Sequence, residues 1–80
     1  MRVKCSVVAY GPGPSEAIVE IPTADGGAEE VIVHAALIDE NGLDIGRALA
    51  EIEDRELVEL PQESVSGRWR LWVPASALAA

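Results

Sequence analysis

Cys5 and His34 are the residues whose chemistry could support catalysis. A thiol and an imidazole on neighbouring strands could act as a nucleophile and its general base. The chain has one cysteine and one histidine, however, so the imidazole has no second histidine with which to share a metal ion. Cys5 also alternates with Val3, Val7 and Ala9, and a cysteine in such a core row is ordinarily a small unreactive hydrophobe. The sequence therefore predicts a protein that is not an enzyme, with no catalytic residue, metal site or cofactor.

The carboxylates and glycines give no better indication of a ligand. Acidic residues gather at 25–30 and at 51–56, but neither run has the spacing of oxygen ligands in a calcium loop. The Gly-Pro-Gly-Pro run at 11–14 lacks the lysine and the following helix of a phosphate-binding loop. We expect solvated charge at the first two places and a turn at the third.

The most promising pattern for binding lies near the carboxyl end. If residues 68–73 form a strand, one side carries Trp69, Leu71 and Val73, which we expect in the core, and the other carries Arg68, Arg70 and Trp72. Tryptophan and arginine are enriched at the energetic centres of protein interfaces. The alternative is that the arginines pair with glutamates of a neighbouring strand while the indole lies over the sheet. The candidate interaction surface is Arg68, Arg70 and Trp72, together with Tyr10.

Composition limits the partners and the compartment. The chain has 80 residues and a net charge of −8, which repels phosphate backbones and anionic lipid headgroups. A single cysteine excludes an intramolecular disulfide and favours a reducing compartment. No signal-peptide core and no membrane-spanning apolar run is visible. We expect a cytoplasmic protein that does not bind membranes and for which nucleic acid is an unfavourable partner.

The apolar pattern predicts one domain, residues 1–80, that is all-β or mainly β. Strands are expected at residues 2–10, 16–21, 29–38, 56–60 and 68–73. The third of these is apolar on both sides, which indicates a central strand or a subunit contact. The connections between the first three strands are short, which favours an antiparallel meander. No internal repeat is evident.

Residues 44–55 leave two alternatives open. Ile45, Ala48, Leu49 and Ile52 recur at helical spacing after Asp44, which could cap a helix. A hairpin is the other reading, because the strand at 56–60 needs a neighbour. The hairpin is favoured slightly.

The run from Gly67 to Leu78 resembles the end of Src-homology-3-like barrels, in which a strand enters a Val-Pro turn of tight helix and a last short strand. Leu43-Asp44-Ile45-Gly46 is similar to the glycine-containing entry of a barrel strand in that family. The resemblance implies a small antiparallel barrel of five to six strands. The aromatic peptide groove of the signalling members is not implied, because this chain has too few aromatic residues. A helix at 44–55 would instead give the topology of an oligonucleotide/oligosaccharide-binding barrel.

Two functions follow as expectations. The first is a non-enzymatic module that binds another protein or itself, in the latter case as a homodimer. The second is a barrel that binds single-stranded nucleic acid through an exposed tryptophan, against which the net charge counts.

Overall fold

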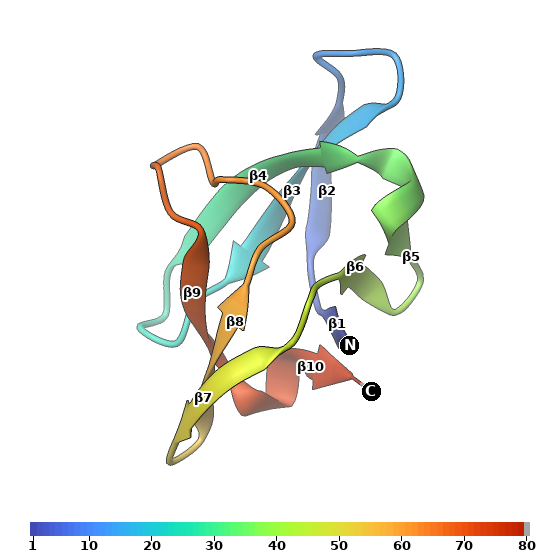
Figure 1. The fold of residues 1–80 in the computed structure, drawn as a ribbon. Coiled ribbons are helices and arrows are strands. Elements are labelled where there is room, and N and C mark those ends of the chain that lie inside the picture. Colours follow the sequence, from blue (N-terminus) through green and yellow to red (C-terminus); the bar gives the residue numbers. More distant parts are fainter. Residues whose placement is uncertain (80) are drawn as a thin grey trace.

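The structure is a computed structural model that describes residues 1–79, and short antiparallel strands dominate it (Figure 1). The strands are β1 (Arg2–Val3), β2 (Ser6–Tyr10), β3 (Glu16–Pro22), β4 (Ala28–His34), β5 (Ile38–Asp39), β6 (Gly42–Asp44), β7 (Ala48–Ile52), β8 (Arg55–Glu59), β9 (Arg70–Pro74) and β10 (Leu78–Ala79). Two turns of 3₁₀-helix, η1 (Ala35–Leu37) and η2 (Ala75–Ala77), follow β4 and β9. Residues 1–79 contain no α-helix. The prediction of a mainly β protein is confirmed.

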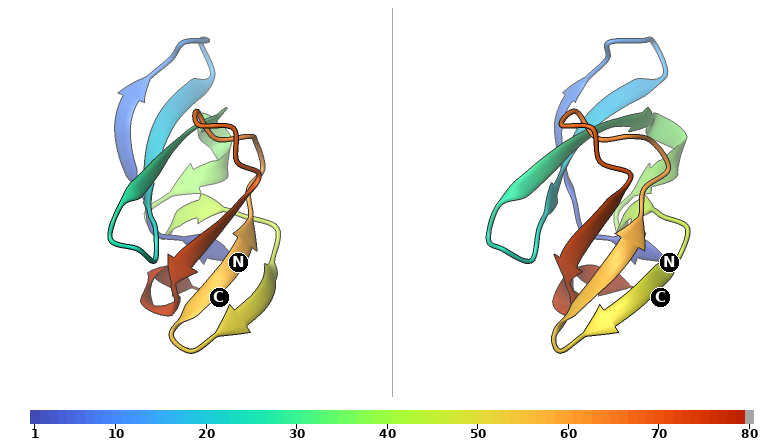
Figure 2. Two further views of the ribbon diagram at one scale, coloured as in Figure 1. Left: turned by 90° about the vertical axis from the view of Figure 1, so that its left-hand side faces the viewer. Right: turned by 60° about the vertical axis from the view of Figure 1, so that its left-hand side comes forward.

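The strands divide into three sheets, each antiparallel. Two are meanders of three strands, β2–β3–β4 and β7–β8–β9, which Figure 2 shows as separate twisted ribbons. The third has the order β10–β1–β6–β5 and joins the two ends of the chain to its middle. Within residues 1–79 these sheets do not close into one barrel, so the predicted barrel of five to six strands is not confirmed.

The helix considered for residues 44–55 is wrong. That segment contains the end of β6, all of β7 and the turn into β8. β7 pairs with β8 from Ala48↔Val58 to Ile52↔Arg55, and Glu53 takes a positive φ of 57° in the connecting turn. β8 therefore gains the neighbour that its backbone groups require.

The core lies between the inner sides of the sheets. Alternation places Val19 and Ile21 of β3 and Val31 and Val33 of β4 inside, where each is at most 1% exposed. Leu71 and Val73 of β9 are buried as predicted. The remaining large core side chains are Val3, Leu43, Ile45, Val58 and Leu60.

Trp69 was predicted to join this core and does not. Its side chain is 54% exposed, because it lies before the start of β9 in the loop from residue 60 to residue 69. Only the backbone of Trp69 continues the pairing, through a hydrogen bond from the Leu60 amide to its carbonyl. The alternation of a strand buries side chains only where another sheet lies opposite.

The first predicted strand is also interrupted. Val3 is buried, but every residue of β2 is exposed, including Val7 and Ala9, which were expected inside. The pairing of β2 with β3 shifts between Val7 and Ala9, which marks a β-bulge, and Val8 has no partner in the pairing register. The strand predicted at 29–38 is shorter, because η1 begins directly after His34.

The fold is internally duplicated, although no repeat was evident in the sequence. Each half consists of a short strand, a three-stranded meander, a 3₁₀ turn and a short strand. η1 and η2 start 40 positions apart, as do β5 and β10. The pairings repeat at the same spacing: Val3 pairs with Leu78, and Leu43 pairs with Ile38. The two halves meet where β1 pairs with β6, near the axis of an approximate two-fold rotation.

Smaller features repeat with the strands. A bulge interrupts β2 between Val7 and Ala9, and another interrupts β7 between Ala48 and Ala50. The first amide of each 3₁₀ turn donates a 2.8 Å hydrogen bond into the preceding hairpin, from Ala35 to Ser15 and from Ala75 to Asp54. In sequence the repeat survives as Ile-Val-Glu-Ile-Pro at 18–22 and Leu-Val-Glu-Leu-Pro at 57–61.

Candidate interaction surface around Trp72

The predicted interaction residues lie on the outward side of β7–β8–β9. We call this side the Trp72 face and define it by Ala50, Ile52, Arg55, Leu57, Glu59, Arg70 and Trp72. Leu71 and Val73 point into the core, so Arg70 and Trp72 point out, as alternation requires. The pairing places Leu57 directly beside Trp72 and Ala50 beside Leu57, which gives the face an apolar centre. Trp72 is partly buried and Ile52 is 55% exposed.

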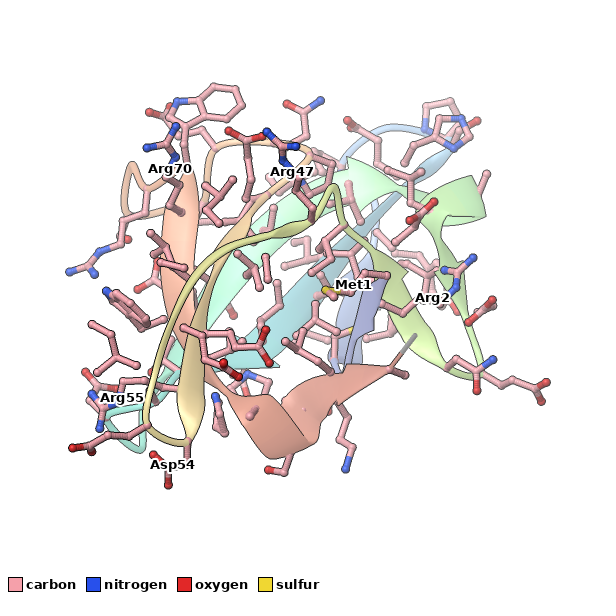
Figure 3. The ribbon with its side chains drawn as sticks, turned by 60° about the horizontal axis from the view of Figure 1, so that its bottom comes forward. Met1, Arg2, Arg47, Asp54, Arg55 and Arg70 are labelled. Carbon is pink, nitrogen blue, oxygen red and sulfur yellow. The ribbon has the colours of Figure 1, made fainter. Side chains whose placement is uncertain are left out.

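Charged side chains flank the apolar centre at both ends. Arg70 lies opposite Glu59, and an ion pair of 3.7 Å joins its Nη2 to the Glu59 Oε2. Arg55 lies opposite Pro74 at the other end, and Figure 3 shows Arg55 and Arg70 at opposite ends of the β8–β9 pair. The cross-strand pairing of an arginine with a glutamate, foreseen as the alternative to a binding role, is therefore present for Arg70. An exposed pair of this kind contributes about 0–1 kcal/mol to stability, so it restrains Arg70 only weakly.

A cleft of about 250 Å³ opens beside Trp72. It lies where the turn between β3 and β4 meets β9, and the Ala24 amide donates a 2.9 Å hydrogen bond to the Trp72 carbonyl there. Arg55 and Arg68 line the cleft together with Asp25 and Glu29. Arg68 thus lines the same cleft as Trp72 although it is outside β9. With Arg70, two positions before Trp72 on β9, three of the six cationic residues lie in this region.

Both acids of the cleft are held in the ionised form. A hydrogen bond from the Thr23 hydroxyl is the main cause that lowers the pKa of Asp25, and the Gly27 amide adds to it. Hydrogen bonds from the Ser66 and Ser64 hydroxyls lower the pKa of Glu29. The Arg68 charge lowers both pKa values further. The cleft therefore presents fixed negative charge beside the arginines.

Trp69 forms a second, shallower hollow with Arg68, Arg70 and Glu59. Arg68 borders both hollows and so connects Trp69 to Trp72. The sequence missed Trp69 as a surface residue, because the two-residue alternation was extended one position beyond the strand. The loop predicted at residues 61–67 indicates that the strand could begin later than residue 68. A side chain at the edge of a loop need not be covered by another sheet.

Tyr10 is not brought together with the three other predicted residues. It lies on β2 in the other meander, is 79% exposed, and lines neither hollow. Its pairing partner on β3 is Ala17.

Cys5 and His34, the residues considered for catalysis, lie where each contributes to the fold. Burial raises the pKa of the Cys5 thiol, which keeps it protonated and weakens it as a nucleophile. The His34 Nδ1 accepts a 3.1 Å hydrogen bond from the Ala36 amide and so caps η1. Among residues 1–79, no group of three or more His, Cys, Asp or Glu side chains is placed to hold a metal ion.

The described residues include no helix of the length and apolar character that crossing a membrane requires. Comparison with known proteins adds no relative: no protein family matches the chain, and neither a curated protein nor a solved structure is significantly similar to it.

Proposed function

We propose that the protein is a non-enzymatic interaction module whose Trp72 face, with Arg68 beside it, binds an acidic and apolar protein surface. The observation that supports this most is the gathering of Arg55, Arg68 and Arg70 around Trp72 in a chain with a net charge of −8. Burial of the apolar centre formed by Leu57 and Trp72 would contribute binding energy, and the arginines would favour partners that carry acidic side chains.

A tryptophan fluorescence titration tests the proposal. Trp69→Phe leaves Trp72 as the only tryptophan, so its emission reports on the face. The probe is a capped heptapeptide that alternates glutamate and valine, and its control carries lysine in place of glutamate. We expect a saturable change with the acidic peptide only, and we expect Arg68→Gln and Arg70→Gln each to weaken it about threefold to tenfold. Equal responses to both peptides, or no saturable response, would remove the proposal.

A second function is supported by Trp69. Its exposed indole lies between Arg68 and Arg70 in a shallow hollow, an arrangement on which a base of single-stranded nucleic acid could stack. The net charge opposes this function. A titration with a single-stranded oligonucleotide at low salt decides, because low salt favours the contact most. Binding there should fall at least tenfold in Trp69→Ala, and an absence of binding ends the idea.

We further propose that the domain is related to Src-homology-3-like barrels and acts in the cytoplasm. The order β9, η2, β10 gives a strand, a tight helical turn and a short strand, which supports the relation. The same order in β4, η1 and β5 shows that each half carries this feature. The single, partly buried Cys5 supports a reducing compartment.

A further inference from the structure

The outward side of β2–β3–β4 is related to the Trp72 face by the internal duplication. We call it the Glu30 face and define it by Ala9, Glu16, Ile18, Glu20, Glu30, Ile32 and His34. Its inward neighbours Ala17, Val19, Val31 and Val33 are all in the core, so alternation turns this set outward. The side chains of Ile18 and Ile32 are partly exposed and lie opposite each other.

The pairing registers match the two faces position by position. Ile18↔Ile32 corresponds to Leu57↔Trp72, so both faces have an apolar centre. Glu20↔Glu30 corresponds to Glu59↔Arg70, and Glu16↔His34 corresponds to Arg55↔Pro74. At two of these matched positions an acid on the Glu30 face is replaced by an arginine on the Trp72 face.

We propose that the Trp72 face of one copy of this chain docks onto the Glu30 face of a second copy, so that the protein associates head to tail. This rests on the proposed function and names its partner. The argument is charge complementarity: Arg55 and Arg70 meet a face that carries Glu16, Glu20 and Glu30 around an apolar centre. A contact between two Glu30 faces would instead place like charges together, and a contact between two Trp72 faces would bring together two arginines and one glutamate from each copy.

The size of the faces sets the strength of the contact. Three strands spaced by about 4.8 Å, with roughly five residues each rising about 3.3 Å, give a footprint of roughly 240 Å². This is well below the roughly 800 Å² per partner of a stable complex. A contact of this size belongs with weak, transient associations. Each added copy leaves one Trp72 face and one Glu30 face free, so the assembly continues beyond a dimer.

Light scattering across a dilution series from 10 μM to 1 mM tests the proposal with the full chain. The average mass of the wild type should rise with concentration and pass that of a dimer. Arg70→Glu and Glu30→Arg should each stay monomeric, because each places like charges in the contact. An equimolar mixture of the two variants should associate again, since each variant supplies the face that the other has lost. Glu40→Arg makes the same change in net charge as Glu30→Arg but lies in the turn between β5 and β6, away from both faces, and should behave as the wild type.

Amide chemical shifts provide a second readout that needs no variant. On concentrating the wild type, residues of both faces should shift together with one apparent Kd. A monomer at 1 mM, or a failure of the mixed variants to associate, would overturn the proposal. A mass that stops at a dimer, with shifts at the Trp72 face alone, would overturn the head-to-tail contact. If the protein stays monomeric but the acidic peptide still binds Trp72, the interaction module stands and its partner is another protein.

Discussion

Glu29 shows how one carboxylate holds a long loop in place. Its Oε1 accepts hydrogen bonds from both Ser64 and Ser66, and the Ser64 hydroxyl in turn accepts one from the Arg68 amide. The position of Arg68 and Trp69 therefore depends in part on Glu29, together with the backbone hydrogen bonds from Ser64 to Arg68 and from Val65 to Glu30. Because the Ser64 and Ser66 hydroxyls lower the pKa of Glu29, these hydrogen bonds favour its ionised form, and their contribution to stability falls in acid.

We expect Glu29→Gln to be less stable than the wild type by about 1 kcal/mol at pH 7, a figure discounted for exposure. Because folding lowers the pKa of Glu29 from its ordinary 4.5, its contribution is complete above that pH and is lost as the pH falls through the lowered value. The difference in stability between variant and wild type should therefore shrink as the pH falls below 4.5. Urea unfolding at several pH values measures it. The exposed Glu63→Gln is the control, and a difference that persists at low pH would contradict the linkage.

Single residues were predictable where a strand faces another sheet. Leu71, Val73 and Val3 were placed in the core correctly because the alternation there is a direct consequence of burial. The prediction that Trp69 is buried was wrong. A tryptophan side chain favours burial, but Trp69 lies in the loop just before β9, where its side chain is exposed. The residue at which β9 begins could not be predicted from the sequence, because the two-residue alternation continues into the preceding loop.

At the scale of elements, the close approach of β1 and β6 depends on Gly42. Its φ is 114°, and a Cβ added there would lie 2.1 Å from the Val3 carbonyl oxygen. Since Val3 and Leu43 pair across the junction of the two halves, a shift of this backbone would disturb that pairing.

Gly42→Ala should lower the free energy of unfolding by about 3 kcal/mol, from left-handed strain together with the backbone clash. Gly26→Ala is the matched control, because Gly26 has a φ of 90° but no atom within 4 Å of an added Cβ. That variant should lose only about 1 kcal/mol. Chemical denaturation compares the two, and equal losses would show that strain alone, without the clash, sets the cost.

The elements were predicted best where turn chemistry and alternation agree. The pairing of β3 with β4 was predictable because two alternating apolar runs, at 16–21 and 29–38, are joined by a short connection. Residues 44–55 remained open because a bulge between Ala48 and Ala50 breaks the two-residue period of β7 and leaves a spacing that also suits a helix. A bulge arises from pairing between strands, which a single strand's sequence does not show.

At the scale of the molecule, the duplication brings the chain ends together. Arg2 pairs with Ala79, just as Gly42 pairs with Asp39 in the matching hairpin of β5 and β6. Figure 1 shows the N and C labels next to each other. The repeat is hard to detect in the sequence for two reasons. The spacing changes from 39 residues between β3 and β8 to 40 residues between η1 and η2, and few residues are identical between the two halves.

A circular permutant tests this symmetry. We expect a chain that starts at Asn41 and ends at Glu40, with its original ends joined by an asparagine–glycine linker, to fold with a stability within about 2 kcal/mol of the parent. The new turn would imitate the one between β5 and β6. Circular dichroism and urea unfolding measure the outcome. A permutant opened between Val19 and Glu20, inside β3, should not fold, and equal stability of the two permutants would argue against the stated role of the halves.

The duplication also explains how one small protein can carry two unlike faces. If the halves were separate identical peptides, folding would depend on their encounter and would fail on dilution, whereas one continuous chain supplies a fixed effective concentration. Identical peptides would also display the same charges on both sides. Once covalently linked, the halves can diverge independently, and Glu16 and Glu30 can remain in one while Arg55 and Arg70 occupy the matching positions in the other. A duplicated chain can therefore carry oppositely charged faces, which a symmetric pair of identical peptides cannot.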